Sequence, residues 1–171
     1  MACHSEGDRC HSMTVSVAMQ ARIDKIDAHL NEHNLRVEKL YGLYPILKSN
    51  SNDSTKSLAC SGAKGSGFSW IAFFFPYAVC TQIREFSFFA FQASFYIIAA
   101  WIHVITGKDF STGVAFGICI AYGYWFPYLR YLALKENRKE YAVFQSIIFG
   151  LFLSFASIIP SIVIESVFIH N

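Results

Sequence analysis

The chain has 171 residues, a formal net charge of +2 and a hydrophobic fraction of 54%. Its length is that of one domain, and its small net charge, without a dense run of Lys and Arg, argues against a nucleic-acid-binding protein. The charges are unevenly placed, because residues 68–171 hold only six basic and five acidic side chains, in short clusters. Long uncharged stretches of this kind are typical of membrane spans. The composition therefore predicts an integral membrane protein that binds no nucleic acid.

Residues 1–21 are predicted to be a flexible tail. Two adjacent pairs in it, Cys3-His4 and Cys10-His11, contain the ligand types that zinc prefers. Their spacing matches no standard zinc site, so a tail without metal is the favoured interpretation and zinc binding is the alternative. We predict no cofactor. The five cysteines of the chain show no framework spacing and are expected to be reduced thiols.

Residues 22–47 are predicted to form one amphipathic helix. Apolar side chains recur there every three or four positions, with charged residues between them, which gives a seam of period 3.5. The favoured interpretation is a helix packed on its own protein or on the bilayer surface. The alternative is a short coiled coil that makes a homo-oligomer, although His33 on the same stripe would weaken it. The seam residues are Ile23, Ile26, Leu30, Val37 and Leu40.

Residues 48–67 have the composition of a linker, rich in Ser, Asn, Gly and Lys. The nearly uncharged run that follows, residues 68–83, would be about 24 Å long as a straight helix, which is short of the roughly 30 Å hydrocarbon core. Pro76 interrupts it, and residues 83–86 contain no Gly, Pro or Asn for a tight reversal. We therefore expect residues 68–85 to form an interfacial or re-entrant helix, with a full span as the alternative.

Three later stretches are long and apolar enough to cross a bilayer as helices. The expected fold is therefore all-α, with a three-helix transmembrane domain over residues 86–171. Basic residues cluster between the second and third stretches, which marks that connection as cytoplasmic by the positive-inside rule. The N-terminus would then be cytoplasmic and the C-terminus periplasmic. The spans cover residues 86–106, 110–129 and 142–164, and the basic residues are Arg130, Lys135, Arg138 and Lys139.

Small residues recur every four positions on two of these spans, a spacing that lets helix backbones approach closely in lipid. The favoured interpretation is that the two stripes face each other within one chain, and the alternative is a seam between copies. These helix-packing residues are Gly113, Gly117 and Ala121 on the second span and Ser146, Gly150 and Ser154 on the third.

His103 and Glu165 are ionisable, and both are expected near the periplasmic end of their spans. Ionisable residues inside a membrane are candidates for function, although side chains so close to the interface can also reach water. Solvated helix ends are the favoured interpretation, and a paired ion or proton site is the alternative.

The stretch FSWIAFFFPYAV, residues 68–79, resembles the aromatic entry motif of a family of small bacterial membrane proteins, the domain of unknown function 2628 family. The chain departs from that family in having Phe75 where Gly is usual before the Pro, and in lacking the basic cluster that follows. The resemblance covers about residues 66–140 and implies a bacterial membrane protein with two or three hydrophobic helices and no assigned activity. The matching positions are Trp70, Ala72, Phe73, Phe74, Phe75 and Pro76.

Function is predicted only in outline. No Ser-His-Asp arrangement or shielded carboxylate pair is recognisable, and GAKGSG, residues 62–67, lacks the strand and helix context of a phosphate-binding loop. We predict a non-enzymatic bacterial inner-membrane protein, an anchor whose N-terminal helix binds a cytoplasmic protein partner or a second copy. The alternative is an oligomeric pore or ion pathway. It ranks second because the spans are very apolar and offer no polar stripe to line a pathway.

Overall fold

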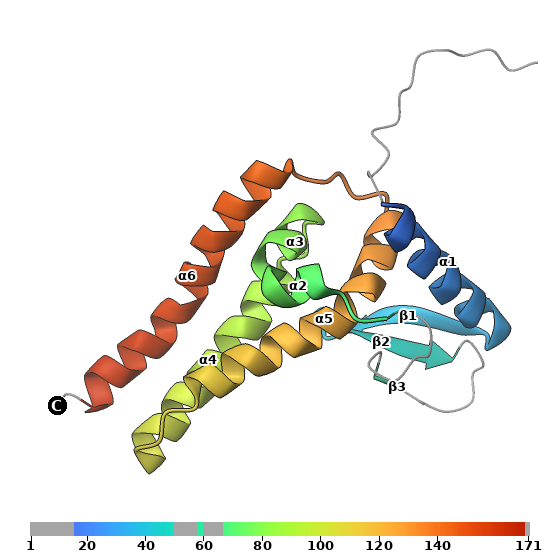
Figure 1. Ribbon diagram of the computed structural model, residues 1–171. Helices are drawn as coiled ribbons and strands as arrows, with labels where there is room; N and C mark the ends of the chain where they lie inside the picture. Colours follow the sequence, from blue (N-terminus) through green and yellow to red (C-terminus); the bar gives the residue numbers. More distant parts are fainter. Residues whose placement is uncertain (1–15, 50–57, 60–66, 170–171) are drawn as a thin grey trace, which may run out of the picture.

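The computed structural model describes residues 16–49, 58–59 and 67–169. This part of the chain is mostly helical, with six helices and one small antiparallel sheet (Figure 1). The prediction of a helical protein is thus confirmed, and the sheet is a feature that it lacked. The helices are α1 Val17–Glu32, α2 Trp70–Phe74, α3 Pro76–Gln82, α4 Ser87–Thr106, α5 Ser111–Lys135 and α6 Val143–Ile169, and the strands are β1 Leu35–Leu40, β2 Tyr44–Ser49 and β3 Leu58–Ala59.

The single helix predicted over residues 22–47 is wrong beyond Glu32, where α1 ends. The helix also begins earlier than predicted, because the Ser16 side chain caps it by accepting a hydrogen bond from the Met19 N–H at 3.3 Å. At the other end, Asn34 has a φ of +50°. Asn tolerates this left-handed conformation better than most residues, and it turns the chain out of the helix.

A β-hairpin takes the place of the second half of the predicted helix. β1 and β2 pair antiparallel around a turn in which Tyr41 and Gly42 both have positive φ, as in a type I′ turn. Val37 and Leu47 are direct partners across the hairpin, and both are buried. The apolar spacing that resembled a helical seam thus comes from two paired strands that turn the same face inward.

Two segments predicted to be irregular, residues 1–21 and 48–67, are only partly described. The predicted tail is wrong from Val17 onward, because α1 begins there. The predicted linker is wrong at both of its described strand segments, since β2 continues to Ser49 and β3 pairs antiparallel with β2. Residues 1–15, 50–57 and 60–66, and with them the Cys3-His4 and Cys10-His11 pairs, lie outside the described residues.

α1, β1 and β2, here called the helix–hairpin unit, share an apolar core that rests on the C-terminal half of α5 (Figure 1). The prediction of a helix packed on its own protein is confirmed for α1. The continuous coiled-coil seam is wrong, because its second half, Val37 and Leu40, lies in β1. The residues of this core are Ile23, Ile26, Leu30, Val37, Leu47, Tyr128 and Tyr131.

Residues 68–83 do not form one straight helix. Pro76 has no N–H with which to continue α2, and its fixed φ instead suits the first position of α3, so the chain breaks at Phe75. α2 runs antiparallel to α5, and α3 returns along α6 to the same end of the bundle (Figure 1). The contacts that trace this path are the ring pairs Phe68–Tyr124 and Phe73–Phe116, 5.0 and 5.7 Å between centroids, and the hydrogen bond from the Tyr141 N–H to the Gln82 carbonyl, 3.0 Å.

A tight turn joins α3 to α4, although residues 83–86 contain no Gly, Pro or Asn. Arg84 adopts a φ of +56°. The N–H groups of Arg84 and Glu85 donate to the carbonyls of Thr81 and Cys80 at 2.9 and 2.7 Å, which is the hydrogen-bond pattern of a Schellman helix end. The expectation that this sequence cannot reverse the chain tightly is therefore wrong.

The remaining helices follow the predicted segments closely. α4 and α6 run side by side in the same direction. After α4 the chain turns at Gly107, which has a φ of +69°, and α5 then runs in the opposite direction. Two helical segments, Ser87–Thr106 and Val143–Phe168, are long and apolar enough to cross a membrane. α5 extends past the predicted end at residue 129 to Lys135. It is not among the helices that are long and apolar enough to cross a membrane.

Candidate functional site

The most heavily charged buried place in the described structure lies at the turn between α3 and α4. Glu85 is only 3% exposed there, and its carboxylate pairs with Lys39 from β1 and with Arg138 from the segment after α5, the latter at 3.0 Å. The Ser87 hydroxyl lies within hydrogen-bond distance of the same carboxylate and of the Leu43 carbonyl in the hairpin. Glu85 thus connects three segments that are far apart in the sequence.

The charge state of Glu85 follows from these partners. Burial alone would raise the pKa of its carboxyl, but the hydrogen bonds from Lys39, Ser87 and Arg138 and the charge of Lys39 outweigh burial, so that pKa lies below its ordinary value. A carboxylate that stays ionised and accepts hydrogen bonds on both oxygens is held in place, and it is not poised to exchange a proton near neutral pH.

A second buried ion pair lies beside the first. Arg130 and Glu140 approach to 2.5 Å and are 7% and 12% exposed. The Gln82 side-chain amide donates to Glu140 at 3.4 Å, and the Arg84 guanidinium lies 4.4 Å from the centre of the Tyr141 ring. The segment after α5 is thereby tied to the end of α3. We call this set the polar junction: Lys39, Glu85, Ser87, Arg130, Arg138 and Glu140.

Further contacts fix the helix–hairpin unit on the bundle. The Tyr131 hydroxyl of α5 donates to Asp27 of α1 at 2.8 Å. The Tyr44 ring of β2 stacks on Trp125 of α5 with 5.5 Å between ring centroids, and the Arg22 guanidinium donates to the carbonyl that precedes α2 at 3.2 Å. Together with the polar junction, these contacts hold the unit in one orientation. Rigid docking, rather than acid–base chemistry, is what this arrangement achieves.

The two predicted small-residue stripes do not pack against each other. On α6, Gly150 lies against the α3 backbone, where an added Cβ would approach the Tyr77 carbonyl oxygen to 2.6 Å. Ser154 is hydrogen-bonded to Gln92 of α4 at 3.1 Å, and Ser146 is buried at 1% exposure. The stripe on α6 is therefore a packing surface for α3 and α4, and the prediction that it faces the α5 stripe is wrong.

The stripe on α5 borders an apolar groove instead. Apart from its sequence neighbours and the surrounding backbone of α5, a Cβ added to Gly113 or Gly117 would find no heavy atom of the described residues within 4 Å. Small residues leave this face of α5 open where large ones would fill it. The groove is lined by Phe91 and Phe95 of α4, Phe110, and Gly113, Gly117 and Ala121 of α5.

His103 and Glu165 do meet, as their expected common depth implied. The His103 Nδ1 and Glu165 Oε1 atoms are 3.2 Å apart, and the side chains are 27% and 38% exposed. Asp109, which follows α4 at the same end, accepts a hydrogen bond from the Ser111 N–H at 2.8 Å. This hydrogen bond lowers the pKa of the Asp109 carboxyl. Asp109 precedes the α5 N-cap, Phe110, and this hydrogen bond ties its side chain to the first turn of α5.

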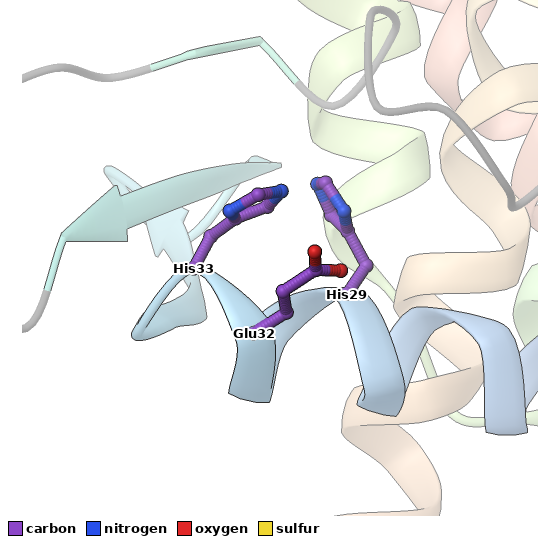
Figure 2. A group of neighbouring side chains, drawn as sticks. All are labelled: His29, Glu32 and His33. Atoms are coloured by element: carbon purple, nitrogen blue, oxygen red, sulfur yellow. The ribbon is translucent and has the colours of Figure 1, made fainter.

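One group of potential ligands was missed by the sequence analysis. His29, Glu32 and His33 lie together at the end of α1, and Figure 2 shows the three side chains on one face of the last turn. The spacing of i, i+3 and i+4 was the available signal. It was obscured because His33 was assigned to the apolar seam.

Comparisons with protein-family models, with curated proteins and with solved structures found no match to this chain. The resemblance of residues 68–79 to the aromatic entry motif therefore rests on that segment alone.

Proposed function

We propose that the chain is a bacterial inner-membrane protein that crosses the bilayer three times and holds a small cytoplasmic unit in a fixed orientation. α4, α5 and α6 would be the spans, and α2 and α3 would form a re-entrant helical pair. The two long apolar helices and the basic residues after α5 support this proposal. The pair α2–α3 fits a re-entrant path because it enters and leaves at one end of the bundle.

The role that fits this arrangement best is that of a non-enzymatic membrane anchor that presents the helix–hairpin unit to a cytoplasmic protein partner. The observation that carries it is the polar junction, because buried ion pairs fix the unit in orientation more than they add to its stability. The apolar face of α1 is already used inside the chain, so the partner would meet the polar outer face. That face exposes Asp24, Lys25, Ala28 and Asn31.

A single-cysteine experiment tests this role. In a chain whose five cysteines are replaced by Ala, we expect Ala28→Cys to react with a membrane-impermeant maleimide only after spheroplasts are permeabilised. Ile26→Cys is the matched control, since Ile26 lies two residues away and is 2% exposed. It should stay unreactive in both states. Labelling of Ala28→Cys in intact spheroplasts would place the unit outside and remove the cytoplasmic role.

The same variant tests for a partner on the outer face. In native permeabilised membranes Ala28→Cys should react more slowly than in membranes washed with salt, because the partner would cover it. Equal rates in the two preparations would show that this face is free, and the anchor would then have no partner at this position.

A proton or ion pathway is the second candidate, favoured by the 3.2 Å contact of His103 and Glu165 between α4 and α6. Proteoliposomes containing the purified chain distinguish the two functions. We expect them to keep a pH gradient as well as empty liposomes do, because the exposed helix faces offer no polar stripe along their length. A proton flux that His103→Gln abolishes would favour the pathway instead.

A further inference from the structure

We propose that the C-terminal end of α1 is a binding site for a divalent transition-metal ion of the zinc class, with His29, Glu32 and His33 as ligands. Residues at i, i+3 and i+4 share one face of a helix. The ligand atoms of the three side chains lie within 4.8 Å of one another, and the two imidazole rings have centroids 4.5 Å apart. Figure 2 shows the two rings facing each other and the Glu32 carboxylate on the same side of the helix, nearer to His29.

The ligand atoms lie within 4.8 Å of one another, which is wider than in an occupied site. Zinc binds imidazole nitrogen and carboxylate oxygen at about 2.0–2.2 Å, so that two ligands of a tetrahedral ion lie roughly 3.4 Å apart. Closing the observed spacing needs only rotations about side-chain bonds. Glu32 and His33 are exposed, so their side chains have room to rotate, and His29 is half-buried. Three protein ligands would leave a fourth position for water.

The electrostatics at this end of the helix also favour a cation. The C-terminal end of a helix carries the negative end of the helix dipole, and Glu32 adds a carboxylate there. Among the described residues, no hydrogen bond or ion pair engages the Glu32 carboxylate or either imidazole. Among these residues, coordination would therefore break no hydrogen bond or ion pair of the three side chains.

The ligand set selects the class of metal. Two imidazoles with one carboxylate suit zinc, copper or nickel, whereas magnesium and calcium prefer oxygen ligands throughout. The site also differs from the zinc-protease motif, in which the Glu follows the first His directly and acts as a base. In this chain Glu32 is on the ligand face itself, so it would bind the ion as a ligand and would not act as a base.

Metal binding would act on the helix–hairpin unit as a whole. The ligands span the last turn of α1, just before Asn34 turns the chain into β1. A bound ion would keep that turn from fraying and would thereby hold β1, whose Lys39 pairs with Glu85, in register with the bundle. This inference depends on the fold of the unit and not on which partner it binds.

Zinc binding by the full chain tests the site. The chain is purified in detergent through a tag without histidine, and Zn²⁺ alone is titrated in competition with a chromophoric chelator. We expect one ion to bind per chain. Either His29→Ala or Glu32→Gln should weaken binding by more than about tenfold, since even the loss of an outer-shell partner costs about 10–100-fold in metal affinity.

The matched control is the double variant His4→Ala/His11→Ala, because the tail pairs are the other candidate ligands in this part of the chain. It should bind Zn²⁺ as the wild type does. Glu32→Gln keeps the helix intact, and its unchanged circular dichroism would separate loss of a ligand from loss of fold. Unchanged affinity in both His29→Ala and Glu32→Gln would overturn the site, and so would loss of the bound ion in the tail variant.

Discussion

Glu85→Gln is expected to release the helix–hairpin unit from the bundle. The substitution removes the one carboxylate that faces both Lys39 and Arg138, which are only 18% and 24% exposed. Breaking a buried pair by removing one partner leaves uncompensated charge inside the protein and typically costs about 3–5 kcal/mol. The free energy of unfolding of the unit should fall by that amount. Fluorescence of Trp125, which stacks on Tyr44 of the hairpin, reports the loss in a urea titration of a chain without the other two tryptophans.

The control for this variant is the same substitution on the surface. Glu38→Gln removes exposed ion pairs with Arg36 and Lys48, in which the side chains are 36–51% exposed, and exposed pairs contribute about 0–1 kcal/mol each. Its urea midpoint should stay close to that of the wild type. If the two substitutions had equal and small effects, the polar junction would not be what holds the unit in place.

Acid provides a second readout of the same group. The pKa of Glu85 is lowered in the folded chain, so its stabilising contribution is complete above the ordinary carboxyl pKa of about 4.3 and is lost as the pH falls through the lower, folded value. The wild type should therefore lose the docked hairpin at pH values below about 4. In Glu85→Gln this acid-dependent loss should be smaller.

The helices of the bundle were predictable because their signal is local. The stretches predicted at residues 86–106, 110–129 and 142–164 became α4, α5 and α6 with ends shifted by at most a few residues, apart from the longer C-terminal ends of α5 and α6. A run of about twenty apolar residues bounded by charged turns needs no knowledge of its neighbours. The common depth of His103 and Glu165 was predictable for a related reason, but their contact was expected only as the alternative to solvated helix ends.

The hairpin was not predicted, because its pairing is not local. Val37, Leu40 and Leu47 fit a helical spacing of three or four residues, and the same residues fit two strands once a turn is placed at Tyr41 and Gly42. Two signals favoured the strands. Asn34 stands just after the last helical turn, where a helix often ends, and Gly42 stands where a tight turn needs it.

The polar junction was also beyond the reach of the sequence. Lys39 and Arg138 are separated from Glu85 by 46 and 53 residues. Each of the three reads as an ordinary surface charge on its own segment. Their pairing depends on how the hairpin docks on the bundle, and no pattern in the sequence indicates that docking.

Gly150→Ala is expected to separate α6 from α3, whereas Gly117→Ala should leave the bundle intact. A Cβ at Gly150 would lie 2.6 Å from the Tyr77 carbonyl oxygen and 3.0 Å from its carbon. These are backbone atoms that cannot rotate away, so the helices must move apart. Overpacking of this kind costs about 1–3 kcal/mol, and the contact with backbone places this site near the upper end. Faster hydrogen exchange at the amides of α3 would report the separation.

Gly117→Ala is the matched control for Gly150→Ala, because both substitutions replace Gly by Ala inside a long helix. The open groove beside Gly117 accepts a methyl group, and Ala favours a helix over Gly by about 1 kcal/mol. The melting temperature in detergent should therefore stay the same or rise slightly. A fall in stability together with a smaller particle by native mass spectrometry would mean that a second copy occupies the groove. The α5 stripe would then be the seam between copies, and the α6 stripe would remain a seam within one chain.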